Sequence, residues 1–247
     1  DQVAIRTINA PDNNAKYGAK QGPVTSAYLK DALAKGADLF KWDEKKKESG
    51  KKNGSKVIGV GVGSAYHSAG AAGFDGLVRI MPDGKLHVHS GCGNLGTYSY
   101  AATARAAAEA LGGSWENMVI ERGDSSKGLP FVLGQFGSNS TYTQTRTNWA
   151  AGMDAKAKLQ EIAAKDLGGA PGDYDTSDGK VFNKANPSKS MSWAQAAKRA
   201  IELGGKYSGK EMPKDLNPIT KWATAGIAGT GLVGVTKDKR PKKGVTP

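Results

Sequence analysis

Cysteine is nearly absent from this sequence of 247 residues, because Cys92 is the only one. One thiol cannot form a disulfide framework, a zinc knuckle or an iron–sulfur cluster within the chain. Any redox cluster of that kind must therefore be held by another chain.

Long apolar runs are missing as well. No stretch approaches the roughly 18 residues that a membrane span needs, and the mean hydropathy is −0.50. No initiator methionine and no basic-then-apolar leader precede Asp1-Gln2-Val3, as expected of a processed, cleaved or partial chain. We expect a soluble protein without a membrane span, from the cytoplasm or the periplasm.

Positive charge, in contrast, is abundant. Lys and Arg number 35 against 23 Asp and Glu, which gives a net charge of +12. Much of this charge lies in two hydrophilic stretches, residues 41–56 and 237–243, which hold few aromatic side chains for base stacking. This distribution of charge does not favour a nucleic-acid-binding protein. A basic surface can, however, bind an acidic partner or an anionic ligand.

The hydrophobic patterns predict an α+β fold in three parts. Residues 1–52 form a helical arm with a charged linker, residues 53–170 form an α+β core, and residues 171–247 form a helical extension with a basic tail. The arm holds helices near residues 3–8 and 26–40. After Pro213 the pattern predicts irregular structure.

The core is expected to begin with a strand over residues 56–63. Residues 74–81 and 85–90 alternate apolar and polar side chains around Pro82-Asp83-Gly84, which predicts an antiparallel hairpin. Further patterns predict four more elements and a second short hairpin around Asp178-Gly179. These elements are a helix over residues 97–111, a strand over 118–122, a helix over 143–167, and a helix from Ser192-Trp193 to Leu203.

A glycine-rich segment, residues 91–96, reads G-x-G-x-x-G between a predicted strand and a predicted helix. Such a loop lets backbone N–H groups approach an anion, and the positive end of the helix adds its field. A dinucleotide-binding domain is one interpretation, but there the strand before the loop opens a parallel βαβ unit. Here the strand before the loop is the second strand of a hairpin, which argues against that domain. The other interpretation is a turn that only shapes the backbone.

A second segment, residues 137–146, places hydroxyl and amide side chains before the helix over residues 143–167. Helix capping would use one or two of them. The surplus indicates a polar ligand with several acceptor atoms, and Arg146 is a candidate phosphate partner.

His87, His89 and Cys92 suggest chemistry that the sequence does not complete. The two histidines alternate on one strand face, which we expect to be exposed rather than a zinc site, because no third ligand lies near them. Cys92 precedes a helix without a local base, which favours a small residue in a tight turn over a nucleophile. We therefore predict neither catalytic nor metal-binding residues in this chain.

The order of the parts resembles the molybdopterin-binding subunit of the xanthine dehydrogenase and aldehyde oxidoreductase family. The resemblance covers roughly residues 55–170 and includes Phe74-Asp75-Gly76, both polar segments, and the helix that continues through residues 155–159. It implies two sets of cofactor contacts. The first set is Gly91, Gly93, Asn94, Leu95, Gly96 and Thr97, and the second is Ser138, Asn139, Ser140, Thr141 and Thr143.

The sequence departs from the family pattern in both segments. The first family loop reads G-G-T-E-M-G-Q-G, whereas this chain has Asn94 for the Glu, Leu95 for the Met and Thr97 for the Gln. The second reads like T-A-A-S-V-S. The upstream F-G-G loop, the arginine loop and the downstream V-G-E glutamate have no match, so the resemblance implies a chain that lacks the catalytic glutamate.

The resemblance implies a component of a molybdenum hydroxylase that oxidises an aldehyde or an N-heterocyclic or aromatic substrate, with water as the oxygen source. The cofactor would be molybdenum–molybdopterin, in its simple form or as the cytosine dinucleotide. The expected partners are the remainder of the subunit or a companion chain, and an iron–sulfur subunit or domain with [2Fe-2S] clusters. The alternative is a non-catalytic basic module that binds anions or nucleotides.

Overall fold

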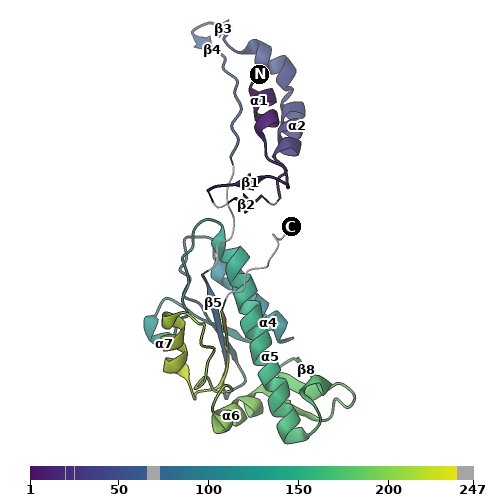
Figure 1. Ribbon diagram of the computed structural model, residues 1–247, viewed down its shortest axis with the longest axis vertical. Coiled ribbons are helices and arrows are strands. Elements are labelled where there is room, and N and C mark those ends of the chain that lie inside the picture. The colour runs from purple at the N-terminus through teal and green to yellow at the C-terminus, as the bar shows by residue number, and fades with distance from the viewer. Residues whose placement is uncertain (20, 25, 66–72, 238–247) are drawn as a thin grey trace. The chain divides into compact units, whose positions relative to one another are not determined.

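The computed structural model describes residues 1–19, 21–24, 26–65 and 73–237. These residues form two compact units, one within Asp1–His67 and a larger one within Ser68–Arg240 (Figure 1). The three-part division predicted from the sequence stays a prediction.

The N-terminal unit consists of short helices and two small ladders. Helices α1 (Gln2–Asn9) and α2 (Leu29–Phe40) confirm the two predicted helices, and α3 (Trp42–Lys45) and the 3₁₀ turn η1 (Lys46–Glu48) follow. The ladders pair β1 (Lys16–Tyr17) with β2 (Gly22–Pro23), and β3 (Lys52–Asn53) with β4 (Lys56–Val57). The strand predicted over residues 56–63 was too long, because Val62 N donates to the Gln2 side chain at 3.1 Å rather than to a strand.

The larger unit is built on a sheet of four strands in the order β11-β5-β6-β7. Strands β5 (Asp75–Ile80) and β6 (Leu86–His89) form the predicted antiparallel hairpin. Helix α4 (Ser99–Ala110) then crosses over, and β7 (Met118–Glu121) pairs parallel with β6. The glycine-rich segment therefore does lie in a strand–helix–strand crossover, although its first strand also belongs to a hairpin.

Residues 218–227 and 232–237 form a helix and a strand, so the prediction of irregular structure was wrong for this part of the chain. Most of the predicted basic tail, residues 238–247, lies outside the described residues. Helix α7 (Pro218–Ile227) leads to β11 (Leu232–Lys237), which pairs antiparallel with β5 along its length. Asn217 caps α7 by accepting from Ile219 N at 2.9 Å. The short apolar run in β11 becomes a strand because β5 offers it an open edge.

Helix α5 (Thr145–Leu167) is the long teal-to-green helix in Figure 1 and packs against β5 and β11 of the sheet and against α4. Glycines allow this close approach. A Cβ at Gly76 of β5 would lie 2.2 Å from Thr147 O, one at Gly234 of β11 would lie 2.4 Å from Ala151 O, and one at Gly152 would meet Ala107 O of α4 at 2.8 Å. The small residues of this interface therefore determine the distance between α5 and the sheet.

The sheet has apolar side chains on both faces. One face packs Val78, Ile80, Leu86 and Val88 against α4, α5 and α6 (Trp193–Leu203). The other packs Leu77, Val233 and Val235 against Ala223 and Ile227 of α7. Both polar segments adjoin this frame, because the first follows β6 and the second leads into α5.

A small antiparallel sheet completes the larger unit, with β8 (Tyr174–Ser177), β9 (Lys180–Asn183) and β10 (Ser190–Ser192). It confirms the hairpin predicted around Asp178-Gly179. Ser192 and Gln195 form a reciprocal capping box at the start of α6, as expected from Ser192-Trp193. The 3₁₀ turns η2 (Trp115–Asn117), η3 (Ser125–Lys127) and η5 (Pro171–Asp173) connect the other elements.

Candidate functional site

The glycine loop, defined as residues 91–98, connects β6 to α4 and takes its shape from Asn94. Asn94 Oδ1 accepts from the backbone N–H groups of Gly96 at 3.0 Å and of Tyr98 at 3.2 Å. Gly96 has φ +92°, a conformation that glycine adopts without strain. Both N–H groups are therefore occupied within the protein, and Asn94 shapes the loop from inside.

Gln135, which the sequence patterns did not single out, forms hydrogen bonds to the same loop from another segment of the chain. Its Oε1 accepts from Leu95 N at 3.1 Å, and its Nε2 donates to Thr97 Oγ1 at 2.8 Å and to Ser99 Oγ at 2.7 Å. A lone glutamine between Gly134 and Phe136 carries no periodic signal. Only the folded chain reveals this contact.

The serine–threonine segment, defined as residues 137–144, is mostly helical rather than a loop. Ser140–Gln144 forms a π-helical turn that runs directly into α5, and such turns occur frequently at functional sites. Asn139, Ser140 and Thr143 are only 1%, 7% and 0% exposed, whereas Ser138 and Thr141 are exposed. Thr143 Oγ1 donates to Asn139 Oδ1 at 2.6 Å, so the segment satisfies part of its own polarity.

A buried polar network joins the two segments. Gln144 Nε2 bonds Ser90 Oγ at the end of β6, and Thr103 Oγ1 of α4 donates to Gln144 Oε1 at 3.0 Å. Cys92 Sγ lies 3.6 Å from Ser140 Oγ. Buried polar groups are costly unless they are paired, so this network specifies one arrangement of the two segments.

The two predicted contact sets are therefore brought together, but their members are placed differently. A Cβ at Gly91 would lie 2.4 Å from Pro130 O, so this glycine serves backbone packing. At Gly93, no heavy atom among the described residues lies within 4 Å of such a Cβ. The side chains and backbone that face solvent are those of Gly93, Asn94, Leu95, Gly96, Thr97, Ser138 and Thr141.

This solvent-facing set fits an acceptor-rich, anionic group. It offers hydroxyl and amide donors, while the missing side chain at Gly93 leaves open space for close approach. Arg146 is the second residue of α5, and its guanidinium lies 5.0 Å from the centre of the Tyr142 ring. The exposed Leu95, at 73%, adds an apolar surface beside the polar groups.

The two histidines of β6 are covered, so the expectation of an exposed strand face was wrong. His89 is 1% exposed, and its Nδ1 lies 2.9 Å from Lys127 O. Burial, with Arg79 nearby, lowers the pKa of His89 to about 4. Lys127 of η3 lies against His89, a contact that sequence alternation could not foresee.

His87 and Glu121 form an ion-pairing cluster with Lys127 rather than a metal centre. His87 Nδ1 lies 2.9 Å from Glu121 Oε1, and Lys127 Nζ lies 3.0 Å from Glu121 Oε2. Burial would raise the pKa of Glu121, but the hydrogen bonds from Lys127 and His87 hold it below its usual value. Within the described ranges, no three His, Cys, Asp or Glu side chains gather as metal ligands do.

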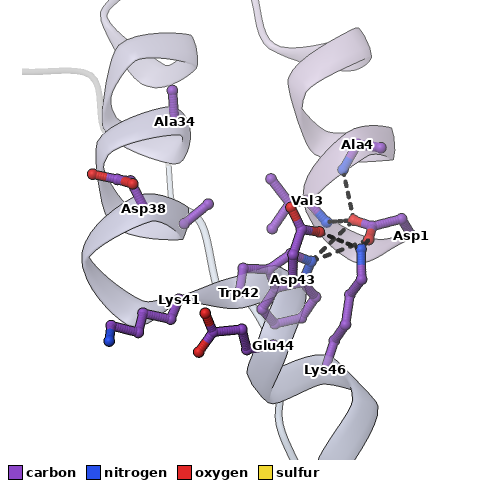
Figure 2. Close-up of a pocket in the computed structure, with 11 residues that line it drawn as sticks. Asp1, Val3, Ala4, Ala34, Asp38, Lys41, Trp42, Asp43, Glu44 and Lys46 are labelled. Carbon is purple, nitrogen blue, oxygen red and sulfur yellow. Dashed lines mark hydrogen bonds and ion pairs between the residues drawn. The ribbon is translucent and has the colours of Figure 1, made fainter.

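A cavity of about 810 Å³ lies in the N-terminal unit, between α1, α2 and α3 (Figure 2). Figure 2 shows that its polar contacts converge on the Asp1 carboxylate. Asp1 caps α1 through Val3 N and Ala4 N, and accepts from Trp42 Nε1 at 3.1 Å and Lys46 Nζ at 3.0 Å. These bonds join the start of α1 to α3 and η1, so we assign the cavity a structural role.

Comparison with known sequences matches most of the chain to one family. The sequence profile of the molybdopterin cofactor-binding domain matches residues 35–234. The chain is 31% identical over 189 residues to the aldehyde oxidoreductase molybdenum-binding subunit PaoC of Escherichia coli O157:H7, covering 74% of this chain and 24% of that protein. It is 29% identical over 197 residues to the carbon monoxide dehydrogenase large chain of Afipia carboxidovorans, covering 77% and 22%.

Solved structures show the same fold at lower identity. Quinoline 2-oxidoreductase from Pseudomonas putida 86 superposes with a TM-score of 0.54 at 16% identity, covering 95% of this chain and 30% of that one. Reconstituted CO dehydrogenase from Oligotropha carboxidovorans gives 0.56 at 21% identity, covering 98% and 30%. The predicted α+β class is confirmed.

The chain spans about a quarter of the length of the curated relatives that it matches. No helix among residues 1–65 and 73–237, as far as they are described, has the length and apolarity to cross a membrane.

Proposed function

Because the chain belongs to the molybdopterin cofactor-binding domain family, whose relatives include molybdenum-dependent oxidoreductases, we propose that its two polar segments hold one side of a molybdenum–molybdopterin cofactor. The observation that carries the proposal is their convergence. Gln144 bonds Ser90, and Cys92 lies against Ser140, so two segments about fifty residues apart pack against each other.

The exposed members of the two predicted sets are the proposed contacts. The Asn94 amide, the Thr97, Ser138 and Thr141 hydroxyls, and the open backbone at Gly93 would donate to phosphate and pterin acceptor atoms. The buried members Asn139, Ser140 and Thr143 would position these contacts rather than touch the cofactor. The net charge of +12 favours association with anionic ligands in general.

When bound, the cofactor would supply the redox chemistry of a hydroxylase that oxidises an aldehyde or an N-heterocyclic or aromatic carbon with oxygen from water. The cytosine dinucleotide form is compatible with the proposal, since the loop surface is open to solvent. This chain would bind and orient the cofactor, and the catalytic glutamate would come from outside it.

The proposed partners follow from what the chain does not supply. They are the remainder of the molybdenum-binding subunit or a companion chain, and an iron–sulfur subunit or domain that receives the electrons. The single cysteine, Cys92, is buried and cannot ligate a [2Fe-2S] cluster alone.

The first experiment is molybdenum analysis together with pterin fluorescence on natively purified protein and every chain that purifies with it. Near-stoichiometric molybdenum and pterin are expected. A folded protein free of both, which binds inorganic pyrophosphate with a steep salt dependence, would instead establish the alternative, a basic module for anions or nucleotides.

A further inference from the structure

Gln135 lies outside both predicted contact sets. Among the described residues, it is the one such residue whose side chain makes three hydrogen bonds to the glycine loop and the start of α4. Its amide uses its acceptor on Leu95 N and its donor group on the hydroxyls of Thr97 and Ser99. We propose that Gln135 is a positioning residue that holds the glycine loop in its ligand-receiving conformation. The inference rests on the proposed function only for the identity of the ligand.

The glycine loop needs such support. It contains Gly91, Gly93 and Gly96, and glycine loses more conformational freedom on ordering than any other residue. The Leu95 side chain is largely in solvent, so packing does little to hold the middle of the loop. The bond from Leu95 N to Gln135 fixes the backbone at this point.

Gln135 can act as an anchor because its own segment is tied to the sheet and to α7. Phe131 N donates to Thr220 Oγ1 at 2.9 Å, and Asp75 N donates to Phe131 O at 3.0 Å. Val132 forms a bridge with Phe74. Gly134 then turns the chain with φ +129°, where a Cβ would lie 2.7 Å from the Phe136 ring.

The direction of the hydrogen bonds determines what the loop offers to a ligand. Nε2 of Gln135 can only donate, so Thr97 Oγ1 and Ser99 Oγ accept from it. Each hydroxyl keeps its own hydrogen for another acceptor. Since Thr97 is exposed, its hydrogen is available to an acceptor oxygen of the ligand, such as a phosphate or carbonyl oxygen.

Substitution by glutamate separates this role from a purely structural one. The carboxylate of Gln135→Glu can still accept from Leu95 N, so the loop stays ordered. This carboxylate cannot donate a hydrogen bond, so the Thr97 and Ser99 hydroxyls would turn their hydrogens toward it. In addition, its negative charge would oppose an anionic ligand. A residue that only maintained the fold would tolerate this nearly isosteric change.

The experiment compares Gln135→Glu, Gln135→Leu and a control in the natively purified protein. The control is Gln160→Leu, which removes the bond from Gln160 Nε2 to Tyr174 O at 2.7 Å beside the small sheet. Hydrogen exchange at the Leu95 amide reports loop order, and molybdenum and pterin content per chain reports ligand retention.

In Gln135→Leu we expect Leu95 exchange to accelerate on the order of tenfold, as loss of one hydrogen bond implies, and cofactor content to fall. Gln135→Glu should keep Leu95 protected but lose cofactor, and Gln160→Leu should keep both at the wild-type level. Unchanged Leu95 exchange in Gln135→Leu, or full cofactor content in Gln135→Glu, overturns the proposal.

The two proposals fail in distinguishable ways. Wild-type protein without pterin refutes the proposed function, whereas Leu95 exchange in Gln135→Leu still decides whether Gln135 orders the loop. If Gln135→Leu does not fold, Gln135→Glu still tests the proposal, because full cofactor content in that variant overturns it.

Discussion

The ammonium group of Lys158 donates to the carbonyl oxygen of Val233 at 2.8 Å, which ties the middle of α5 to the outer edge of β11. Lys158 also bonds Asp154 Oδ2 at 2.7 Å, and the same oxygen accepts from Val235 N at 3.0 Å. Two side chains one helical turn apart thus satisfy backbone groups that β5 cannot reach. Pairing of this kind protects an edge strand from other partners.

Substitution Lys158→Met keeps the aliphatic stem but leaves Val233 O and Asp154 without the ammonium group. Because Lys158 is buried, we expect a loss of about 1–3 kcal/mol in the free energy of unfolding, measured by urea titration. The control is Lys206→Met, whose more exposed ion pair with Glu161 should contribute at most about 1 kcal/mol. Equal losses in the two variants would argue against the edge contact.

Substitution Gly234→Ala should destabilise the larger unit through packing alone. The added Cβ would lie 2.4 Å from Ala151 O and 2.9 Å from Ala155 Cβ, so α5 must move away from β11. Overpacking of a core typically costs about 1–3 kcal/mol, which thermal unfolding would show as a lower Tm. An unchanged Tm would mean that α5 does not lie this close to β11.

Substitution Gly93→Ala should reduce cofactor content without reducing stability. Gly93 does not need a left-handed conformation, and a methyl group there would project into space clear of the other described residues. Stability should stay level or rise by about 0.4–1 kcal/mol, whereas the methyl group would block close approach of a ligand.

The control for Gly93→Ala is Gly172→Ala, since Gly172 has the same open surroundings among the described residues but lies in η5. Molybdenum and pterin content, with Tm, checks both variants. If Gly93→Ala retains full cofactor content, the ligand does not approach the loop at Gly93.

His89 should make stability depend on pH in weakly acidic solution. Its pKa in the folded protein is about 4 against 6.5 as the ordinary value, because burial and Arg79 oppose its charge. Between these values the unfolded chain binds the proton and the folded one does not, so stability falls as pH falls. From pH 7 to pH 5 the expected loss is about 2 kcal/mol.

Urea unfolding at both pH values checks this prediction, with His89→Gln as the comparison. Because the glutamine side chain in this variant stays neutral, the loss of stability from pH 7 to pH 5 should shrink by about the same 2 kcal/mol. The neighbouring His87, Glu121 and Arg79 stay in place. An equally steep dependence in His89→Gln would assign the effect to another group.

Local patterns were sufficient for much of the fold. The alternation around Pro82-Asp83-Gly84 predicted β5 and β6, and Ser192-Trp193 predicted the start of α6. Where the signal depended on a partner, prediction failed. The β11 segment has an ordinary apolar run, but only the open edge of β5 makes it a strand, and His89 lies against Lys127 of η3 far along the chain.

Residue types and short spacings were enough to locate the two polar segments, to establish the family resemblance and to exclude a cluster ligated within the chain. Which members of those segments face solvent depended on how the chain folds. The tertiary structure buried Asn139, Ser140 and Thr143, left Thr97 and Ser138 exposed, and placed Gln135 against the glycine loop. The physical reason is that hydrogen bonds between Ser90 and Gln144, and between Gln135 and Leu95, join positions that no local pattern relates.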